Sequence, residues 1–98
     1  MLECGVKIKV RFFTTLREIV GKKEEELILQ PNATLEDVFN SLSRKYGSRF
    51  TDYTLDEGAI KPFLQVLING RNANLLDGMA THLNEGDTIA IIPPVGGG

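Results

Sequence analysis

The chain has 98 residues, of which 42% are hydrophobic and 24% charged, and its formal net charge at pH 7 is -2. This length and composition indicate a single globular domain and argue against a disordered chain. Eleven basic residues against 13 acidic ones offer no basic surface for a phosphate backbone, so nucleic acid is not an expected partner. No apolar run reaches the ~20 residues of a membrane span, and the N-terminus lacks the apolar core of a signal peptide.

Few side chains suggest catalysis or metal binding. The single cysteine, Cys4, cannot form an internal disulfide or a four-thiolate metal site, which favours a reducing, cytoplasmic location. His82 has no second histidine at ligand spacing, and Asp77 and Asp87 are interpreted as turn residues. We therefore expect neither a metal site nor a bound cofactor.

The N-terminal part predicts a strand, a short helix and a second strand. Residues 6–12 alternate apolar and charged side chains, the pattern of a strand with one buried face. Phe13 breaks this alternation and is predicted to place its ring on the opposite face. Residues 14–20 then predict a short helix that ends at Gly21, and residues 25–29 a strand that pairs with the first.

The main helix is predicted after Thr34, which is a credible N-cap with Asp37 three positions later. Gly47 is expected to end this helix. Five apolar residues follow the helical spacing and form one stripe that can cover a sheet: Leu35, Val38, Phe39, Leu42 and Tyr46.

Two stretches carry weaker signals. The charged run at residues 22–26 is interpreted as a solvated turn and strand edge. Residues 48–62 form a connection longer than the ~12–15 residues that a compact domain usually leaves without structure. We therefore expect partial turns in this segment, around residues 53–58.

The C-terminal part predicts a hairpin and a central strand. Residues 63–68 predict a strand, Asn69-Gly70 a tight hairpin turn, and residues 71–74 a short edge strand. The last strand, residues 88–92, is apolar on both faces, as expected for a central strand beside the first one and parallel to it. The predicted fold class is α+β, with a mixed sheet of four to five strands and one main helix packed across it.

The chain ends in Pro93-Pro94-Val95 and three glycines. Proline cannot donate ladder hydrogen bonds, so we predict a folded domain at residues 1–92 and a flexible tail at residues 93–98. An extended tail of this length reaches about 20 Å. Glycine has no Cβ, so such a tail can enter a narrow channel and present an unhindered carboxyl group. These properties suit activation of the terminal carboxylate as an acyl-adenylate by a nucleotide-dependent partner.

Motifs at both ends carry a family resemblance. The stretch Ile8-Lys-Val-Arg-Phe-Phe13, continuing through Leu16-Arg-Glu-Ile-Val-Gly21, resembles the start of the small subunit of molybdopterin synthase (MoaD) in the MoaD/ThiS family. The ending Pro93-Pro-Val-Gly-Gly-Gly98 is similar to the Pro-Pro-Val-x-Gly-Gly terminus of that family. The Thr34 helix and Asn84-Glu-Gly-Asp87 occur in matching order. This resemblance implies a ubiquitin-like β-grasp fold.

The resemblance also implies a role as a sulfur carrier that is not itself an enzyme. A MoeB-like adenylating enzyme would charge Gly98 with ATP, and a sulfur donor protein would convert it to a thiocarboxylate. A MoaE-like large synthase subunit would then accept the tail, with Gly96 and Gly97 threading into its active site. There the sulfur would pass to cyclic pyranopterin monophosphate, on the route to the molybdenum or tungsten cofactor.

Docking of these partners is predicted on the open sheet face and the tail. The candidate residues are Phe13, Leu67, Ile91 or Ile92 depending on the phase of the last strand, and Pro93, Pro94 and Val95. An exposed apolar patch of this kind is typical of a partner site. The alternative is that the long connection covers these side chains.

Three other functions stay open from the sequence. A ubiquitin-like protein modifier would join Gly98 to lysines of target proteins. A carrier of the thiazole pathway shares the glycine ending, although the Phe12-Phe13 and Pro93-Pro94 features favour the molybdopterin type. A β-grasp interaction module would use no carboxyl chemistry, and removal of Gly97 and Gly98 would leave its function intact.

Overall fold

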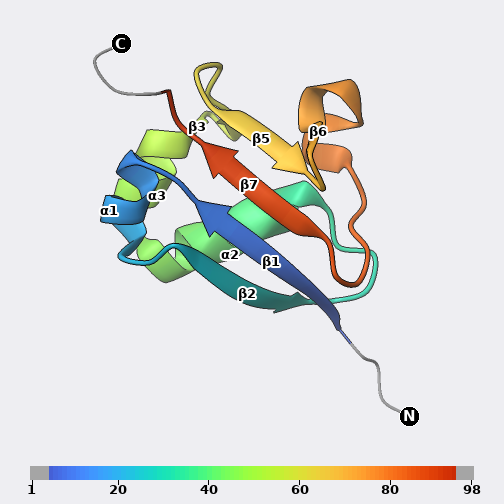
Figure 1. Cartoon of the computed structure of the whole chain (residues 1–98). Coiled ribbons are helices and arrows are strands. Elements are labelled where there is room, and N and C mark those ends of the chain that lie inside the picture. Colours follow the sequence, from blue (N-terminus) through green and yellow to red (C-terminus); the bar gives the residue numbers. More distant parts are fainter. Residues whose placement is uncertain (1–4, 95–98) are drawn as a thin grey trace.

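The computed structural model describes residues 5–94, which form one five-stranded mixed sheet with a helix packed across one face (Figure 1). The strand order is β2-β1-β7-β5-β6, and only the β1–β7 pair is parallel. The predicted α+β architecture and the central place of the last strand beside the first are therefore confirmed. The strands are β1 (Val6–Phe12), β2 (Glu24–Leu29), β5 (Gln65–Ile68), β6 (Arg71–Asn72) and β7 (Thr88–Ile92).

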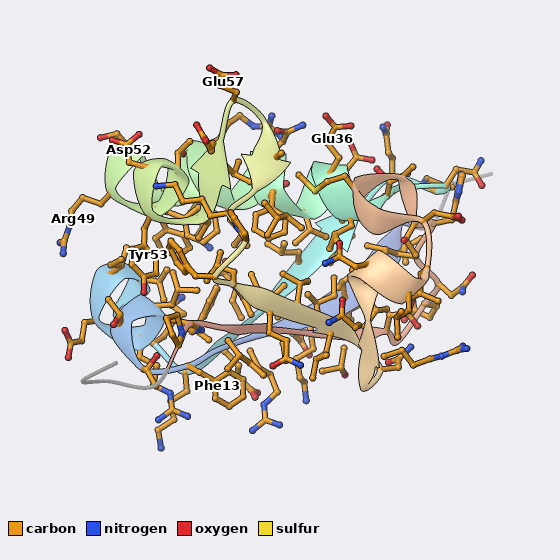
Figure 2. The ribbon with its side chains drawn as sticks, turned by 90° about the horizontal axis from the view of Figure 1, so that it is seen from above. Phe13, Glu36, Arg49, Asp52, Tyr53 and Glu57 are labelled. Atoms are coloured by element: carbon orange, nitrogen blue, oxygen red, sulfur yellow. The ribbon has the colours of Figure 1, made fainter. Side chains whose placement is uncertain are left out.

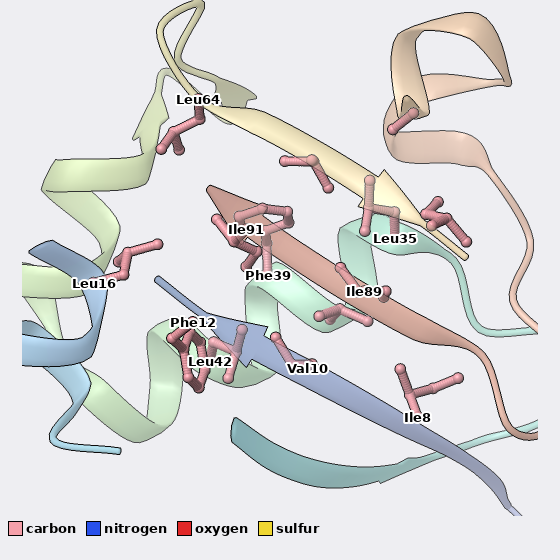
Figure 3. Packing of buried hydrophobic residues seen from close by; sticks show 14 of the residues in the cluster. Ile8, Val10, Phe12, Leu16, Leu35, Phe39, Leu42, Leu64, Ile89 and Ile91 are labelled. Atoms are coloured by element: carbon pink, nitrogen blue, oxygen red, sulfur yellow. The ribbon is translucent and has the colours of Figure 1, made fainter. Parts of the chain in front are cut away.

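Helix α2 (Leu35–Tyr46) crosses this sheet and has the predicted boundaries. Its N-terminus is capped because the backbone N–H of Thr34 donates to Asp37 Oδ2 at 2.9 Å. The apolar stripe packs on inward side chains of the three central strands, and Figure 3 shows this core. Fully buried members of the core are Ile8, Val10, Phe12, Leu35, Val38, Phe39, Leu42, Ile89 and Ile91.

Helix α1 (Thr15–Val20) follows β1 closely, and Leu16 anchors it in the core. Gly21 ends it in the left-handed conformation with φ of 83°, as the sequence predicts. The Asn69-Gly70 turn is also confirmed, because both residues have positive φ, 51° and 84°.

The connection at residues 48–62 contains more regular structure than the sequence predicts. It forms helix α3 (Ser48–Thr54) and a small hairpin of β3 (Leu55–Asp56) and β4 (Ala59–Ile60). Phe50 is fully buried, with its ring centroid 6.1 Å from that of Phe39. The expected turn exists between β3 and β4, but the helix was missed. A helix of seven residues has little stability of its own, so its packing through Phe50 decides that it forms.

Two predicted strands are shorter in the structure. The strand expected from residue 63 begins at Gln65, because the N–H of Leu64 donates to the Lys61 carbonyl at 3.0 Å and closes a turn that contains Pro62. The edge strand expected at 71–74 ends at Asn72. Two 3₁₀ turns then follow, η1 (Ala73–Leu75) and η2 (Gly78–Ala80).

The interpretation of residues 22–26 as solvated is wrong for Glu25. This residue pairs with Val10 in the ladder, so its side chain points to the helix side and is 7% exposed. Lys45 and Tyr46 of α2 both donate hydrogen bonds to its carboxylate, and Lys22 Nζ lies 3.8 Å from Oε1. Glu25 thus connects β2 to α2 through hydrogen bonds.

These contacts move two pKa values in opposite directions. Burial alone raises the pKa of Glu25, but the hydrogen bonds from Lys45 and Tyr46 and the charges of Lys45 and Lys22 outweigh it. The net result is a pKa of Glu25 below the ordinary value of 4.5. Burial and the neighbouring carboxylate raise the pKa of Tyr46, so its hydroxyl remains a donor at neutral pH.

Replacement of Glu25 should make stability less dependent on acidity. Because folding lowers the pKa of Glu25, its stabilisation is present above pH 4.5 and is lost as the pH falls through the lowered pKa. We expect Glu25→Gln to reduce the free energy of unfolding by about 1–2 kcal/mol at neutral pH, with the difference shrinking in acid. Urea unfolding of both proteins between neutral and acidic pH measures this. Glu26→Gln, at an exposed position of the same strand, is the matched control, and a pH-independent difference for Glu25→Gln contradicts the prediction.

Candidate functional site

The candidate site surrounds the end of β7, where the chain leaves the sheet. Phe12 pairs with Ile91 in the parallel ladder, so the ends of β1 and β7 lie together at one edge. Helices α1 and α3 lie on the same side of the molecule as this edge (Figure 1). Pro93 is buried and Pro94 is exposed. The predicted carrier residues Val95, Gly96, Gly97 and Gly98 lie outside the described residues, and the division at residue 93 stays a prediction.

The open face of the sheet, opposite α2, gathers several partly exposed apolar side chains. Register places Ala90 between Arg11 and Leu67 in one row across three strands. Ile92 lies two residues further along β7, nearer the tail, and Phe13 follows the end of β1. Figure 2 shows Phe13 on the side of the sheet away from α2 and α3. We call Phe13, Leu67, Ala90 and Ile92 the open-face cluster.

The structure decides between the two isoleucines offered by the sequence. Ile91 is fully buried in the core, and only Ile92 shares the open face with Leu67. The assignment of Ile91 to a docking surface is therefore wrong, because strand alternation points it toward α2. Pro93 is buried as well, so of the two prolines after β7 only Pro94 is exposed.

Two arginines flank Phe13: Arg11, which strand alternation places on the same face, and Arg17 of α1. The guanidinium carbons of Arg11 and Arg17 lie 5.6 and 5.5 Å from the centroid of its ring. Arg17 Nε also donates to the Phe12 carbonyl at 2.9 Å, which fixes the arginine beside the ring. Exposed cation–π contacts of this kind contribute about 0.5–1 kcal/mol each. The ring is thus held in place and has a positively charged rim. Alternation along β1 predicts the contact with Arg11, whereas the contact with Arg17 depends on how α1 follows the strand.

The long connection does not cover the open-face cluster. Phe50 of α3 packs against Phe39 and Tyr46, which belong to the helix side of the sheet. Figure 2 shows α3 and Phe13 on opposite sides. The alternative that residues 48–62 hide the apolar side chains is excluded by this placement.

The remaining candidates behave as structural residues. Asp87 accepts hydrogen bonds at 2.8 Å from Asn69 Nδ2 and from the N–H of Asn84, so it fixes two turns as predicted. Asp77 precedes η2, and His82 is exposed. Cys4 lies outside the described residues. Among residues 5–94, no helix is long and apolar enough to cross a bilayer.

Comparisons with known proteins identify the family and the fold of this chain. The family model described as the ThiS family matches residues 10–98. The chain is 41% identical over 93 residues to small archaeal modifier protein 3 of Haloferax volcanii, covering 95% of this chain and all of that protein. It is 28% identical to the molybdopterin synthase sulfur carrier subunit of Drosophila yakuba, covering 95% of this chain and 92% of that protein. A solution structure from Haloferax volcanii matches with a TM-score of 0.85 and 39% identity, covering all of this chain and 92% of the other.

The chain belongs to the ThiS family of ubiquitin-like sulfur carriers. The predicted β-grasp fold and the predicted family are both confirmed. Small carriers of this family are non-catalytic proteins, so this chain is a donor of a group and not a catalyst.

Substitutions of the two neighbouring isoleucines in β7 should differ in their effect on stability. Ile91→Lys places a charge in the core without a partner, and we expect a loss of roughly 3–5 kcal/mol of unfolding free energy or no folded protein. Ile92→Lys lies on the open face and should cost about 1 kcal/mol or less. Thermal unfolding by circular dichroism compares the two, and similar losses would contradict the assignment of faces.

Proposed function

We propose that the carboxyl group of Gly98 is the reacting group of this carrier. The observation that carries the proposal is the match of the ThiS family model through residue 98, where three glycines follow the prolines. One carboxylate oxygen attacks the α-phosphorus of ATP held by an adenylating partner and pyrophosphate leaves. Sulfide then attacks the carbonyl carbon of the acyl-adenylate and AMP leaves, which gives the thiocarboxylate.

The open-face cluster supports docking of the activating partner. It lies beside the point where the chain leaves β7, so a partner seated on Phe13 and Ile92 has the tail within reach of its active site. An extended tail of six residues spans about 20 Å. The positively charged rim of Arg11 and Arg17 favours an acidic surface on that partner.

The proposed destination of the sulfur is cyclic pyranopterin monophosphate in a MoaE-like synthase subunit, after charging by a MoeB-like enzyme and a sulfur donor protein. The N-terminal Phe12-Phe13 motif and the similarity to the Drosophila yakuba carrier subunit support this destination. The chain supplies no side chain to the transfer. It holds no cofactor of its own in this proposal, and ATP is consumed by the partner.

Protein modification is a second candidate, favoured by the 41% identity to small archaeal modifier protein 3. The same acyl-adenylate serves this reaction. A lysine amine, instead of a sulfur nucleophile, displaces the activating group and forms an isopeptide bond with Gly98. The two functions share the first step and differ in the nucleophile that the partner presents.

Incubation with ATP, the adenylating enzyme and a sulfide source tests the proposed carrier chemistry. We expect intact-mass spectrometry to detect exchange of one oxygen for one sulfur at Gly98. Deletion of Gly97 and Gly98 should abolish the exchange and leave thermal stability unchanged, because the deleted residues follow the core. An unmodified mass for the full chain, or full biological function of the truncated chain, overturns the proposal and favours an interaction module.

Conjugation is tested by adding lysine-containing acceptor protein to the charged carrier. Formation of an isopeptide between Gly98 and a lysine, detected by tandem mass spectrometry, supports the modifier function. Rescue of molybdopterin formation in cells lacking their own small synthase subunit supports the sulfur-transfer function instead. Failure to rescue, together with efficient conjugation, would exclude the molybdopterin destination.

A further inference from the structure

Strand β2 presents a free edge. It pairs with β1 and with no other strand among residues 5–94. The Phe12 N–H donates to the Lys23 carbonyl at 2.8 Å, which fixes the phase of the ladder. Backbone groups alternate along an antiparallel strand, so those of Glu24, Glu26 and Ile28 point outward. These groups can pair with a strand of another chain.

Only the first half of this edge is protected by charge. Glu24 and Glu26 are exposed there, and Glu24 lies 3.9 Å from both Lys9 Nζ and Arg11 Nε. Charged side chains of this kind discourage pairing between sheet edges. At the other end of β2, Ile28 is 72% exposed. The unprotected half of the edge therefore has both free backbone groups and an exposed apolar side chain.

A hollow of about 340 Å³ adjoins this unprotected half. We call it the β2–α2 groove; it is lined by residues 28–30 of the strand end and by Asp37, Asn40, Ser41 and Arg44 of α2. A strand added to β2 would direct every second side chain into the groove and the others beside Ile28. The lining is mostly polar, so the groove suits a polar or charged side chain.

The lining of the groove contains one negatively charged side chain, Asp37, and one positively charged side chain, Arg44. The carboxylate of Asp37 already accepts from the N–H of Thr34 at 2.9 Å, and Lys45, the next residue after Arg44, is paired with Glu25. Arg44 is exposed and forms no ion pair within residues 5–94. A guanidinium group matches a carboxylate in both charge and shape.

We propose that the β2–α2 groove binds an extended segment of a partner protein. This segment adds to β2 as a strand, places an apolar side chain beside Ile28 and directs a carboxylate toward Arg44. Main-chain hydrogen bonds supply affinity and the alternate side chains supply specificity in this mode of binding. The free end of β2 lies away from the end of β7 in Figure 1, so the groove and the tail can be occupied together.

The probe for this proposal is a short synthetic peptide that alternates valine with threonine and carries one glutamate in place of a central threonine. Titration into the isotope-labelled full chain, followed by NMR, should shift the backbone amides of Glu26 and Ile28. We expect Arg44→Glu to weaken binding by about tenfold or more, as for loss of a charge-assisted hydrogen bond. Arg49→Glu, an exposed arginine of α3 outside the groove, is the matched control and should bind normally.

Two further comparisons sharpen the test. A peptide with lysine in place of its glutamate should bind more weakly than the original. Ile28→Pro removes one outward N–H and leaves the β1 ladder intact, so it should also weaken binding. If this variant does not fold, the comparison of Arg44→Glu with Arg49→Glu decides the test. Amide shifts confined to the open-face cluster, equal affinity for Arg44→Glu and wild type, or dimerisation of the free chain through β2 would overturn the proposal. None of these results depends on Gly98, so sulfur transfer can fail or succeed independently.

Discussion

The parallel pairing of β1 with β7 joins two segments that are far apart in the chain and sets the position of everything around them. Val10 faces Ile89 and Phe12 faces Ile91, and all four side chains are fully buried under α2. Closing so long a loop costs conformational entropy, which this buried ladder must offset. Because the two strands run in the same direction, they end at the same edge, and the chain leaves β7 close to Phe13.

The alternation of strand residues places the side chains that stabilise the fold on one face of the sheet and the side chains that a partner can contact on the other. Inward side chains of β1, β5 and β7 form the core with α2, whereas outward side chains such as Arg11, Leu67 and Ala90 remain within reach of a partner. A body of this kind can change its docking surface without repacking its core. The hydrogen bonds of Lys45 and Tyr46 to Glu25 add a polar link between β2 and the end of α2.

The proposed reaction at the carboxyl group of Gly98 places two demands on the fold. The folded body has to keep its own groups away from the reacting carbonyl and still deliver the tail to enzymes that supply the chemistry. Sulfur transfer and protein modification meet this demand in the same way, because both proceed through an activated carboxyl group. In this proposal the choice between them depends on which partners dock, so the open-face cluster and the β2–α2 groove are the surfaces proposed to determine function.

Local signals in the sequence determined most of the framework. The alternation in residues 6–12, the Thr34 and Asp37 cap and the Asn69-Gly70 turn each depend on neighbours in the chain, so they were predicted correctly. The two terminal motifs identified the family for the same reason, since each is a contiguous run of residues.

Tertiary structure decided the features that depend on distant residues. Helix α3 forms because Phe50 packs on Phe39, and the burial of Glu25 follows from donors 20 and 21 positions away. The phase of β7, which separates Ile91 from Ile92, was fixed by its register with β1 and β5. A strand that is apolar on both faces contains no local information on which face is buried, so only its neighbours in space could settle that choice.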